Sequence, residues 1–200
     1  MHRRWRPLLA LALIATPLSG AAGHPHIFIK HGMTLLFGAH DLVGIRMRWT
    51  FDEMYSAMLE ADYTKAQDGS VTPEEVKRIE KENFSNLANY NFFIDLKIND
   101  APVRVTDVQD FAATFSDHRA TFEFTVPIKT GELREPNIAE IGVFDPEYYV
   151  EFTILDHDPI TIENGSAFAV ECQVVRDQPR NTPLGTKFAD VAVCTYRVKP

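Results

Sequence analysis

Two histidines separated by one proline, His24-Pro25-His26, are the residues whose types and spacing best suit chemistry in this chain. In an extended segment, residues two apart project from the same face, so both imidazoles would point one way. Such a pair suits tetrahedral zinc or square-planar copper or nickel. If the chain were cut directly before His24, its α-amine would add a nitrogen and form a histidine brace for copper. The alternative is a frayed terminus that binds no metal, in which Pro25 only restricts the backbone.

Two nitrogens do not make a selective metal site, so further ligands must come from elsewhere in the chain. Neutral imidazoles are needed for binding, and metal affinity should therefore fall below about pH 6.5. Spacing alone does not say which other donors lie near the terminus. The candidates to complete or flank the site are Asp52, Glu53, His118 and Asp145.

The N-terminus has the parts of a cleaved secretory signal over residues 1–23. Three arginines lie within the first six residues, and Leu8–Leu18 is an apolar run. A permanent transmembrane helix needs about 20 apolar residues, so this run fits a cleaved signal better. Small residues allow cleavage after Ala22 or after Gly23. We therefore expect an exported domain over 24–200, without stable membrane insertion.

The charge of the chain limits its partners. The formal net charge is −8, and loss of residues 1–23, which carry three arginines and no acids, makes it −11. An acidic protein repels phosphate backbones, so nucleic acid is not an expected partner. No Gly-x-Ser-x-Gly elbow and no glycine-rich phosphate loop occurs in the sequence. The chain is therefore not expected to be an enzyme.

The segment from Thr64 to Glu75 aligns with a calcium-binding EF-hand loop. Gly69 falls at the turn position and Glu75 at the bidentate position. Ala66, however, stands where the loop needs a side-chain oxygen. Calcium is therefore not expected, and the segment should persist as a turn and a helix cap.

Cys172 and Cys194 are the cysteines of the chain. In an oxidising compartment, two cysteines pair more often than they bind metal. The bridge would close a loop of about 22 residues and stabilise the fold by roughly 3 kcal/mol in the chain-entropy model. We predict a Cys172–Cys194 disulfide.

Most of the exported chain has the pattern of β-strands. In 43–49, apolar residues alternate with Arg46 and Arg48, which is typical of a half-buried strand with outward arginines. Asn99-Asp100 predicts a hairpin turn. Strands are expected at 27–29, 33–37, 42–49, 92–98, 103–108, 112–115, 119–128, 138–144, 148–154, 168–175 and 191–198, and a surface loop at 177–185.

Helical character is confined to residues 51–90. Apolar residues recur at helical spacing from Phe51 to Ala61. A second helix should begin after Thr72, with Pro73 in its first turn and Glu75 closing a capping box, and continue to about Tyr90. The whole chain is predicted to be mainly β, a β-sandwich-like domain with a two-helix insertion at 51–90, α+β overall.

The chain has four ordered motifs, at 24–29 (HPHIFI), 49–56 (WTFDEMYS), 68–75 (DGSVTPEE) and 144–150 (FDPEYYV). Together they resemble the bacterial domain-of-unknown-function family 1007, over essentially the whole exported chain. The resemblance implies the periplasm and a link to ABC-type transport systems, beside membrane transporters of the nickel and cobalt type. The ordinary two-lobed α/β architecture of substrate-binding proteins is not expected.

Three functions follow from these patterns. The leading one is a periplasmic accessory protein that binds nickel, cobalt, zinc or copper partly through His24 and His26, and serves a membrane metal transporter. The second is a metal-independent protein-interaction module. The third is a copper oxygenase with an N-terminal histidine brace. The interaction module would present Phe51, Tyr55, Tyr148 and Tyr149.

Overall fold

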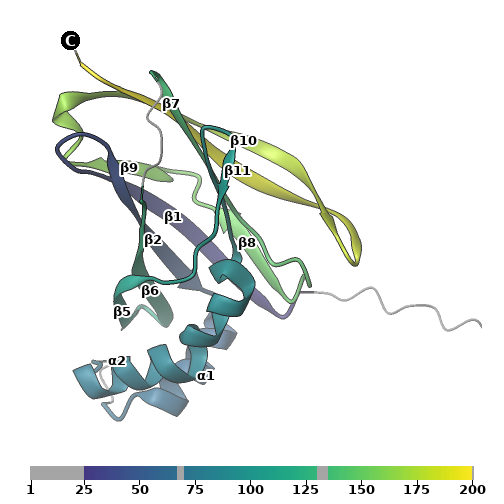
Figure 1. The fold of residues 1–200 in the computed structure, drawn as a ribbon. Coiled ribbons are helices and arrows are strands. Elements are labelled where there is room, and N and C mark those ends of the chain that lie inside the picture. Colours follow the sequence, from purple (N-terminus) through teal and green to yellow (C-terminus); the bar gives the residue numbers. More distant parts are fainter. Residues whose placement is uncertain (1–24, 67–69, 130–134, 200) are drawn as a thin grey trace, which may run out of the picture.

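Two β-sheets form most of the molecule, and the helical insertion with α1 and α2 lies at one end of them (Figure 1). The computed structural model describes residues 25–66, 70–129 and 135–199. The predicted leader, the position of its cleavage and His24 lie outside the described residues. The architecture confirms the predicted β-sandwich-like fold with its helical insertion.

The first sheet has six strands and is built around the N-terminal strand. β1 (Ile27–Phe37) pairs with β2 (Leu42–Phe51) on one side and with two short parallel strands on the other. The remaining strands of this sheet are β5 (Gln109–Ser116), β6 (Arg119–Pro127), β8 (Val150–Ile154) and β9 (Ile160–Glu163).

The second sheet has five strands in the order β10-β11-β7-β3-β4. Its short hairpin turns at Asn99-Asp100, where both residues have positive φ, as the predicted turn requires. The strands are β3 (Ile94–Ile98), β4 (Ala101–Val103), β7 (Asn137–Val143), β10 (Phe168–Thr182) and β11 (Gly185–Val198).

Gly32 does not end the first strand, although a break was predicted there. β1 runs through it and changes partner at this point, from β8 up to His31 to β9 from Met33 onward. A Cβ on Gly32 would lie 2.9 Å from Leu155 Cδ1 and 3.3 Å from the Pro159 carbonyl oxygen. The glycine therefore admits the loop that joins the two parallel strands.

The helical insertion contains α1 (Glu53–Tyr63) and α2 (Pro73–Ile79). The predicted capping box is confirmed, because Thr72 and Glu75 exchange hydrogen bonds. The predicted continuation to Tyr90 as one regular helix is wrong. A π-helical turn, η1 (Glu80–Phe84), follows α2, and a 3₁₀ segment, η2 (Ser85–Phe93), ends in residues with positive φ. A short 3₁₀ turn, η3 (Gly165–Ala167), precedes β10.

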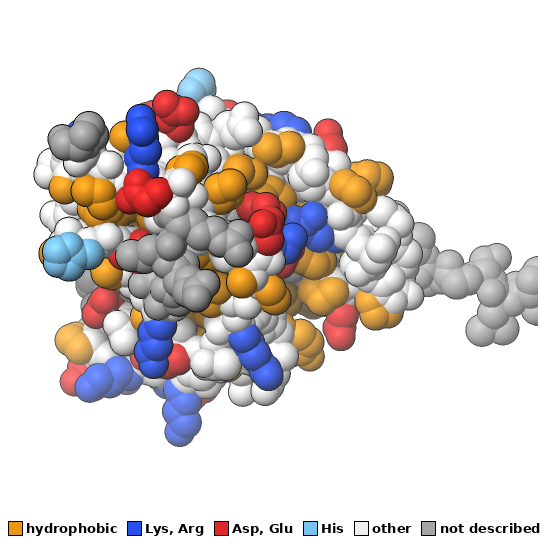
Figure 2. All heavy atoms as spheres, turned by 45° about the horizontal axis from the view of Figure 1, so that its top comes forward, with side chains coloured by type: hydrophobic (Ala, Val, Ile, Leu, Met, Phe, Trp, Pro, Cys, Tyr) orange, Lys and Arg blue, Asp and Glu red, His pale blue; other side chains and the backbone are white. Residues whose placement is uncertain are grey.

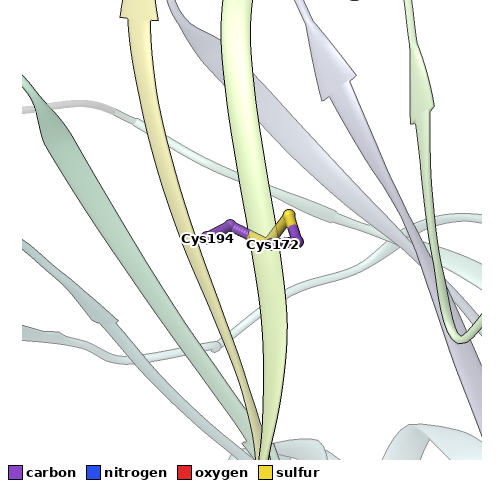
Figure 3. The surroundings of a disulfide bond; sticks show 2 residues. All are labelled: Cys172 and Cys194. Carbon is purple, nitrogen blue, oxygen red and sulfur yellow. A yellow bond between two sulfur atoms is a disulfide. The ribbon is translucent and has the colours of Figure 1, made fainter.

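A long ribbon of β10 and β11 replaces the loop predicted at 177–185. The two strands stay paired from Phe168↔Val198 to Thr182↔Gly185, with one irregularity after Val175. The predicted disulfide is confirmed, and Cys172 and Cys194 face each other across this ribbon (Figure 3). The disulfide links two neighbouring strands covalently.

The core between the sheets is rich in aromatic side chains. Trp49 on β2 is fully buried and meets Phe124 edge to face, with ring centroids 4.9 Å apart. The alternation predicted for this strand holds for Ile45, Met47 and Trp49, which point inward. Val43 is 49 % exposed instead, because the pairing of β2 with β1 shifts register there: Leu36 pairs with Gly44 and Phe37 with Leu42, which leaves Val43 as the extra residue of a bulge.

The surface carries mixed charge. On the face drawn in Figure 2, acidic and basic side chains lie interspersed with hydrophobic ones. Within the described part of the chain, no helix is long and apolar enough to cross a membrane.

Candidate functional site

His26 lies exposed at the start of β1, against the segment that leads into β8. Its backbone N–H donates to the Tyr149 carbonyl oxygen at 2.8 Å, and its ring lies 4.9 Å from the Tyr149 ring, centroid to centroid. No side-chain hydrogen bond or ion pair to another described residue engages its imidazole. The backbone is therefore fixed while both ring nitrogens remain available.

Asp145 anchors the segment on which His26 rests. Its carboxylate is buried and accepts three backbone hydrogen bonds: Oδ1 from Glu147 at 2.9 Å, and Oδ2 from Tyr149 and Val150 at 2.9 and 3.0 Å. Both oxygens are thus engaged by the turn that follows. In this arrangement Asp145 positions Tyr149, and a role as a metal ligand would require these hydrogen bonds to be shared.

Asp52 connects the start of α1 to β1. Its Oδ1 caps the helix by accepting the Tyr55 N–H at 2.9 Å, and its Oδ2 accepts the Phe28 N–H at 2.8 Å. The Asp52 N–H in turn donates to the Phe28 carbonyl oxygen. Because Phe28 is two residues after His26, this exchange holds the N-terminal strand from its other side.

Glu53 and His118 lie at the junction of α1 with the β5–β6 turn. Glu53 forms an ion pair with Arg119 at 2.9 Å, and the same guanidinium donates to the Phe51 carbonyl oxygen. His118 is exposed and sits in the tight turn with a φ of 59°. Its backbone has the conformation of a hairpin turn residue, and this structural role explains its position in the β5–β6 turn.

The candidate ligands that the structure describes do not converge into one cluster. Among residues 25–66, 70–129 and 135–199, no three His, Cys, Asp or Glu side chains are grouped closely enough to hold a metal ion. His26, Asp52 and Asp145 do share one end of the first sheet through their backbone contacts. His24 lies outside the described residues, so the pairing of the two histidines stays a prediction.

Glu147 is a residue of this region that the sequence patterns missed. It is exposed, lies two residues before Tyr149, and its carboxylate has no partner among the described residues. The sequence Asp145-Pro146-Glu147 is typical of a turn, and this signal could have pointed to the arrangement. Glu147 is the carboxylate of this turn that remains free to bind a cation.

The aromatic residues proposed as a protein-binding surface are divided by the fold. Phe51 is buried in the core, and Tyr55 packs against it with ring centroids 5.2 Å apart. The Lys187 ammonium lies 4.1 Å from the centre of the Tyr148 ring. Tyr149 is 55 % exposed and remains beside His26.

In the calcium-like loop, the Glu75 carboxylate serves the helix start. Oε2 accepts from the Thr72 backbone and hydroxyl, and Oε1 accepts the Lys65 N–H at 3.2 Å. The Thr72 backbone hydrogen bond is the main cause of a lowered pKa of Glu75. Gly69 lies outside the described residues. Both oxygens of the bidentate position are thus used by the cap.

His31 faces the interior, on the opposite side of β1 from His26, as the alternation of the strand predicts. It is 2 % exposed, and its Nδ1 is buried without a hydrogen-bond partner among the described residues. Burial lowers the pKa of His31 to about 4, against an opposing effect of the Asp190 charge. The neutral ring is a core residue at neutral pH.

The fold and the site define a two-sheet β-protein with a helical insertion, whose first strand presents an exposed histidine at one end. The chain belongs to the family described as "Protein of unknown function (DUF1007)", whose model matches residues 9–190. This confirms the family resemblance carried by the four motifs.

Two relatives share part of this sequence. An "Uncharacterized protein" of Haemophilus influenzae (strain ATCC 51907 / DSM 11121 / KW20 / Rd) is 25 % identical over 160 residues, which cover 77 % of this chain and 72 % of the relative. An "Uncharacterized 15.5 kDa protein in trpE 3'region" of Spirochaeta aurantia is 23 % identical over 96 residues, which cover 48 % of this chain and 68 % of the relative.

Proposed function

We propose that this protein is a periplasmic accessory protein of a transition-metal transport system, and that it binds nickel, cobalt, zinc or copper through its N-terminal His-Pro-His segment. The observation that carries the proposal is the state of His26. Its backbone is tied to Tyr149 while its imidazole is exposed and unpaired within the described chain. A ligand with a fixed backbone and a free donor loses less conformational entropy when it binds a metal.

The surroundings of His26 support a cation. Glu147 contributes an exposed, unpaired carboxylate to the turn that carries Tyr149. The exported chain has a formal net charge of −11 once residues 1–23, with their three arginines, are removed. We assign His24 and His26 as nitrogen ligands and Glu147 as an oxygen ligand. Asp52 and Asp145 hold the two segments that meet at this point.

Calorimetric titration of the exported protein with each of the four metals tests this function. The variant His24→Ala/His26→Ala should lose at least tenfold in affinity for the preferred metal, since each lost ligand removes more than the 1.4 kcal/mol that a tenfold change represents. Affinity of the parent should also fall in acid, because protons compete with the metal for the imidazole nitrogens. Unchanged affinity in the double variant would sink the proposal.

A matched control separates the terminus from other surface histidines. His40 and His157 are both exposed and lie in turns away from Tyr149 in the sequence. The variant His40→Ala/His157→Ala removes the same number of imidazoles and should retain full affinity. Equal losses in the two double variants would mean diffuse binding to surface histidines, which contradicts a site at the terminus.

A further inference from the structure

One edge of the second sheet is unpaired along the first half of β10. Among the strands of the described chain, β10 pairs with β11 alone, so its other side has no neighbouring strand. The Lys199 N–H donates to the Ala167 carbonyl oxygen at 2.9 Å, which makes these residues a hydrogen-bonded pair in line with the register of the ribbon. Hydrogen-bonded and non-hydrogen-bonded pairs alternate in an antiparallel ladder. The N–H and C=O groups of Val170, Cys172 and Val174 therefore point away from β11.

Two further observations agree with this assignment. The Cα atoms of Cys172 and Cys194 lie 4.1 Å apart, near the spacing of about 4.5 Å that is typical of non-hydrogen-bonded pairs. The outward groups of residues 170, 172 and 174 form no hydrogen bond to a described residue, whereas the Phe168 N–H already donates to the Gly165 carbonyl oxygen. Residues 170–174 thus form an open edge.

The other edges of the two sheets are protected in ways that this one is not. Natural sheets use short edge strands, prolines and bulges there, because unpaired backbone groups can pair with another chain. β4 has three residues, one of which is Pro102, and the pairing of β5 is irregular at Asp110. β8 and β9 have 5 and 4 residues. The second half of β10 contains a register shift and Pro179, and the open edge contains neither.

The side chains of the open edge are complementary to those of a second copy. Antiparallel strands related by a two-fold axis place residues of the same face opposite each other, so the axis passes through one residue pair. With Cys172 on the axis, Val170 lies opposite Val174 of the second copy, and both valines are half-buried against the core. Glu171 then lies opposite Gln173, and both are exposed without a side-chain partner in the described chain. Apolar groups meet on one face, and an amide donor meets a carboxylate on the other.

Neighbouring registers lose this match. An axis at Glu171 would set the two Glu171 carboxylates directly opposite each other, and like charges in that position are destabilising. An axis at Gln173 would set the apolar Val170 opposite the charged Arg176. The register with Cys172 on the axis is therefore the favoured one.

We propose that the open edge of β10 pairs antiparallel with the same edge of a second copy of this chain, so that the two five-stranded sheets join into one sheet across a dimer. The outward-facing pairs would each exchange two backbone hydrogen bonds. This contact does not depend on metal binding at the N-terminus, since β10 contains none of the candidate ligands. Because one pair of strands is a small interface, the dimer should form reversibly.

Sedimentation equilibrium of the exported protein, from about 10 μM to about 1 mM, tests the dimer. EDTA is present, so that metal ions do not bridge the histidine termini of two molecules. The mass should rise from that of one chain to that of two over this range. The mass of a single chain at every concentration would overturn the proposal and leave this edge for a strand of a different protein.

Two proline variants locate the contact. Val174→Pro replaces an N–H at the open edge by a proline ring and removes no hydrogen bond to β11. Val198→Pro is the matched control, because Val198 is exposed, forms a non-hydrogen-bonded pair with Phe168 by the same alternation, and lies beyond the residues that pair with β7. Val174→Pro should weaken dimerisation at least about tenfold, and Val198→Pro should leave it unchanged. Both variants must keep the circular dichroism spectrum of the parent. Equal dimerisation in Val174→Pro and the parent would overturn the assignment to β10.

Two variants of Gln173 test the register without disturbing the core, because this side chain is exposed. Gln173→Glu sets a second carboxylate opposite each Glu171 and should weaken dimerisation about five- to tenfold at low salt. Gln173→Lys sets an ammonium group there and should strengthen it by about the same factor. Gln109→Glu and Gln109→Lys make the same charge changes at an exposed position of β5, in the other sheet, and should dimerise equally well. Equal dimerisation of the two Gln173 variants, or an equal difference within both pairs of variants, would refute the edge pairing.

Discussion

Replacing Asp145 by asparagine should destabilise the protein although the side chain keeps its size. The carboxylate accepts the Glu147 N–H with Oδ1 and the Tyr149 and Val150 N–H groups with Oδ2. An amide has one oxygen, and its NH₂ group cannot accept. In the best orientation, the amide oxygen of the new side chain would keep the pair from Tyr149 and Val150, and the Glu147 N–H would face another donor.

The magnitude follows from the lost acceptor. Hydrogen bonds to a charged group contribute about 1.5–3 kcal/mol each, and one of the three is lost outright while the other two lose their charge assistance. We expect the free energy of unfolding to fall by about 2–4 kcal/mol. Urea unfolding, followed by the fluorescence of Trp49, measures this change. The slope against urea should stay constant, because the same surface is exposed on unfolding.

Glu147→Gln provides the matched control, since it makes the same chemical change two residues away. Its carboxylate is exposed and has no partner in the described chain, so its free energy of unfolding should change by less than about 0.5 kcal/mol. A loss below about 0.5 kcal/mol in Asp145→Asn would refute the anchoring role. A loss of equal size in both variants would indicate a general effect of net charge instead.

Three further perturbations test other parts of the fold. Cys172→Ser/Cys194→Ser should lower the free energy of unfolding by roughly 3 kcal/mol in the chain-entropy model, measured in urea against the oxidised parent; an unchanged midpoint would refute it. Because the pKa of His31 is about 4 in the folded protein and near 6.5 when exposed, the unfolded state binds the extra proton between these values. Stability should therefore fall as the pH drops from about 6.5 to 4, by up to about 1.4 kcal/mol per pH unit, and His31→Gln should flatten this dependence. If parent and variant have parallel profiles, other groups cause the loss. Gly32→Ala should cost about 1–3 kcal/mol in thermal or urea unfolding, since the new Cβ would lie 2.9 Å from Leu155 Cδ1 and 3.3 Å from the backbone oxygen of Pro159, so the side chain and the loop must both shift; a neutral effect would show that the loop yields freely.

Local signals in the sequence predicted the features that depend on near neighbours. The turn at Asn99-Asp100 requires two residues that tolerate positive φ, and the capping box at Thr72 and Glu75 closes within one helical turn. The Cys172–Cys194 pair was predicted from the count of cysteines and the expectation of an oxidising compartment. The turn and the capping box are each decided by a few adjacent residues, so their patterns are readable without the fold.

The strand boundaries that were predicted wrongly depend on distant partners. Gly32 permits β1 to continue because a loop more than 120 residues later packs on it. The Asp177–Gly185 segment has turn-forming composition, yet its residues 178–182 pair with the start of β11. Neither partner can be read from the local sequence, since strand pairing overrides weak local preference.

The sequence predicted the histidine of the candidate site, but it did not predict the roles of the carboxylates. The exposure of His26 follows from strand alternation. The roles of Asp52 and Asp145 depend on which backbone N–H groups reach their oxygens, and a pattern of acidic residues carries no such information. A pocket beside Tyr149 was missed for a related reason, because its walls come from β1, β2, η1, η2 and the turn at Tyr149 together.

The place of β1 in its sheet also sets the order in which the molecule can be completed. The first strand of the described chain finds two of its three partners, β8 and β9, in residues 150–163. A polypeptide delivered N-terminus first must wait for that late segment before its own beginning is locked in place, and contacts so far apart in sequence form slowly. The contact of His26 with Tyr149 forms in the same late step. The metal-binding end proposed for this protein is thus assembled only after most of the chain has emerged, which postpones metal capture until folding is nearly finished.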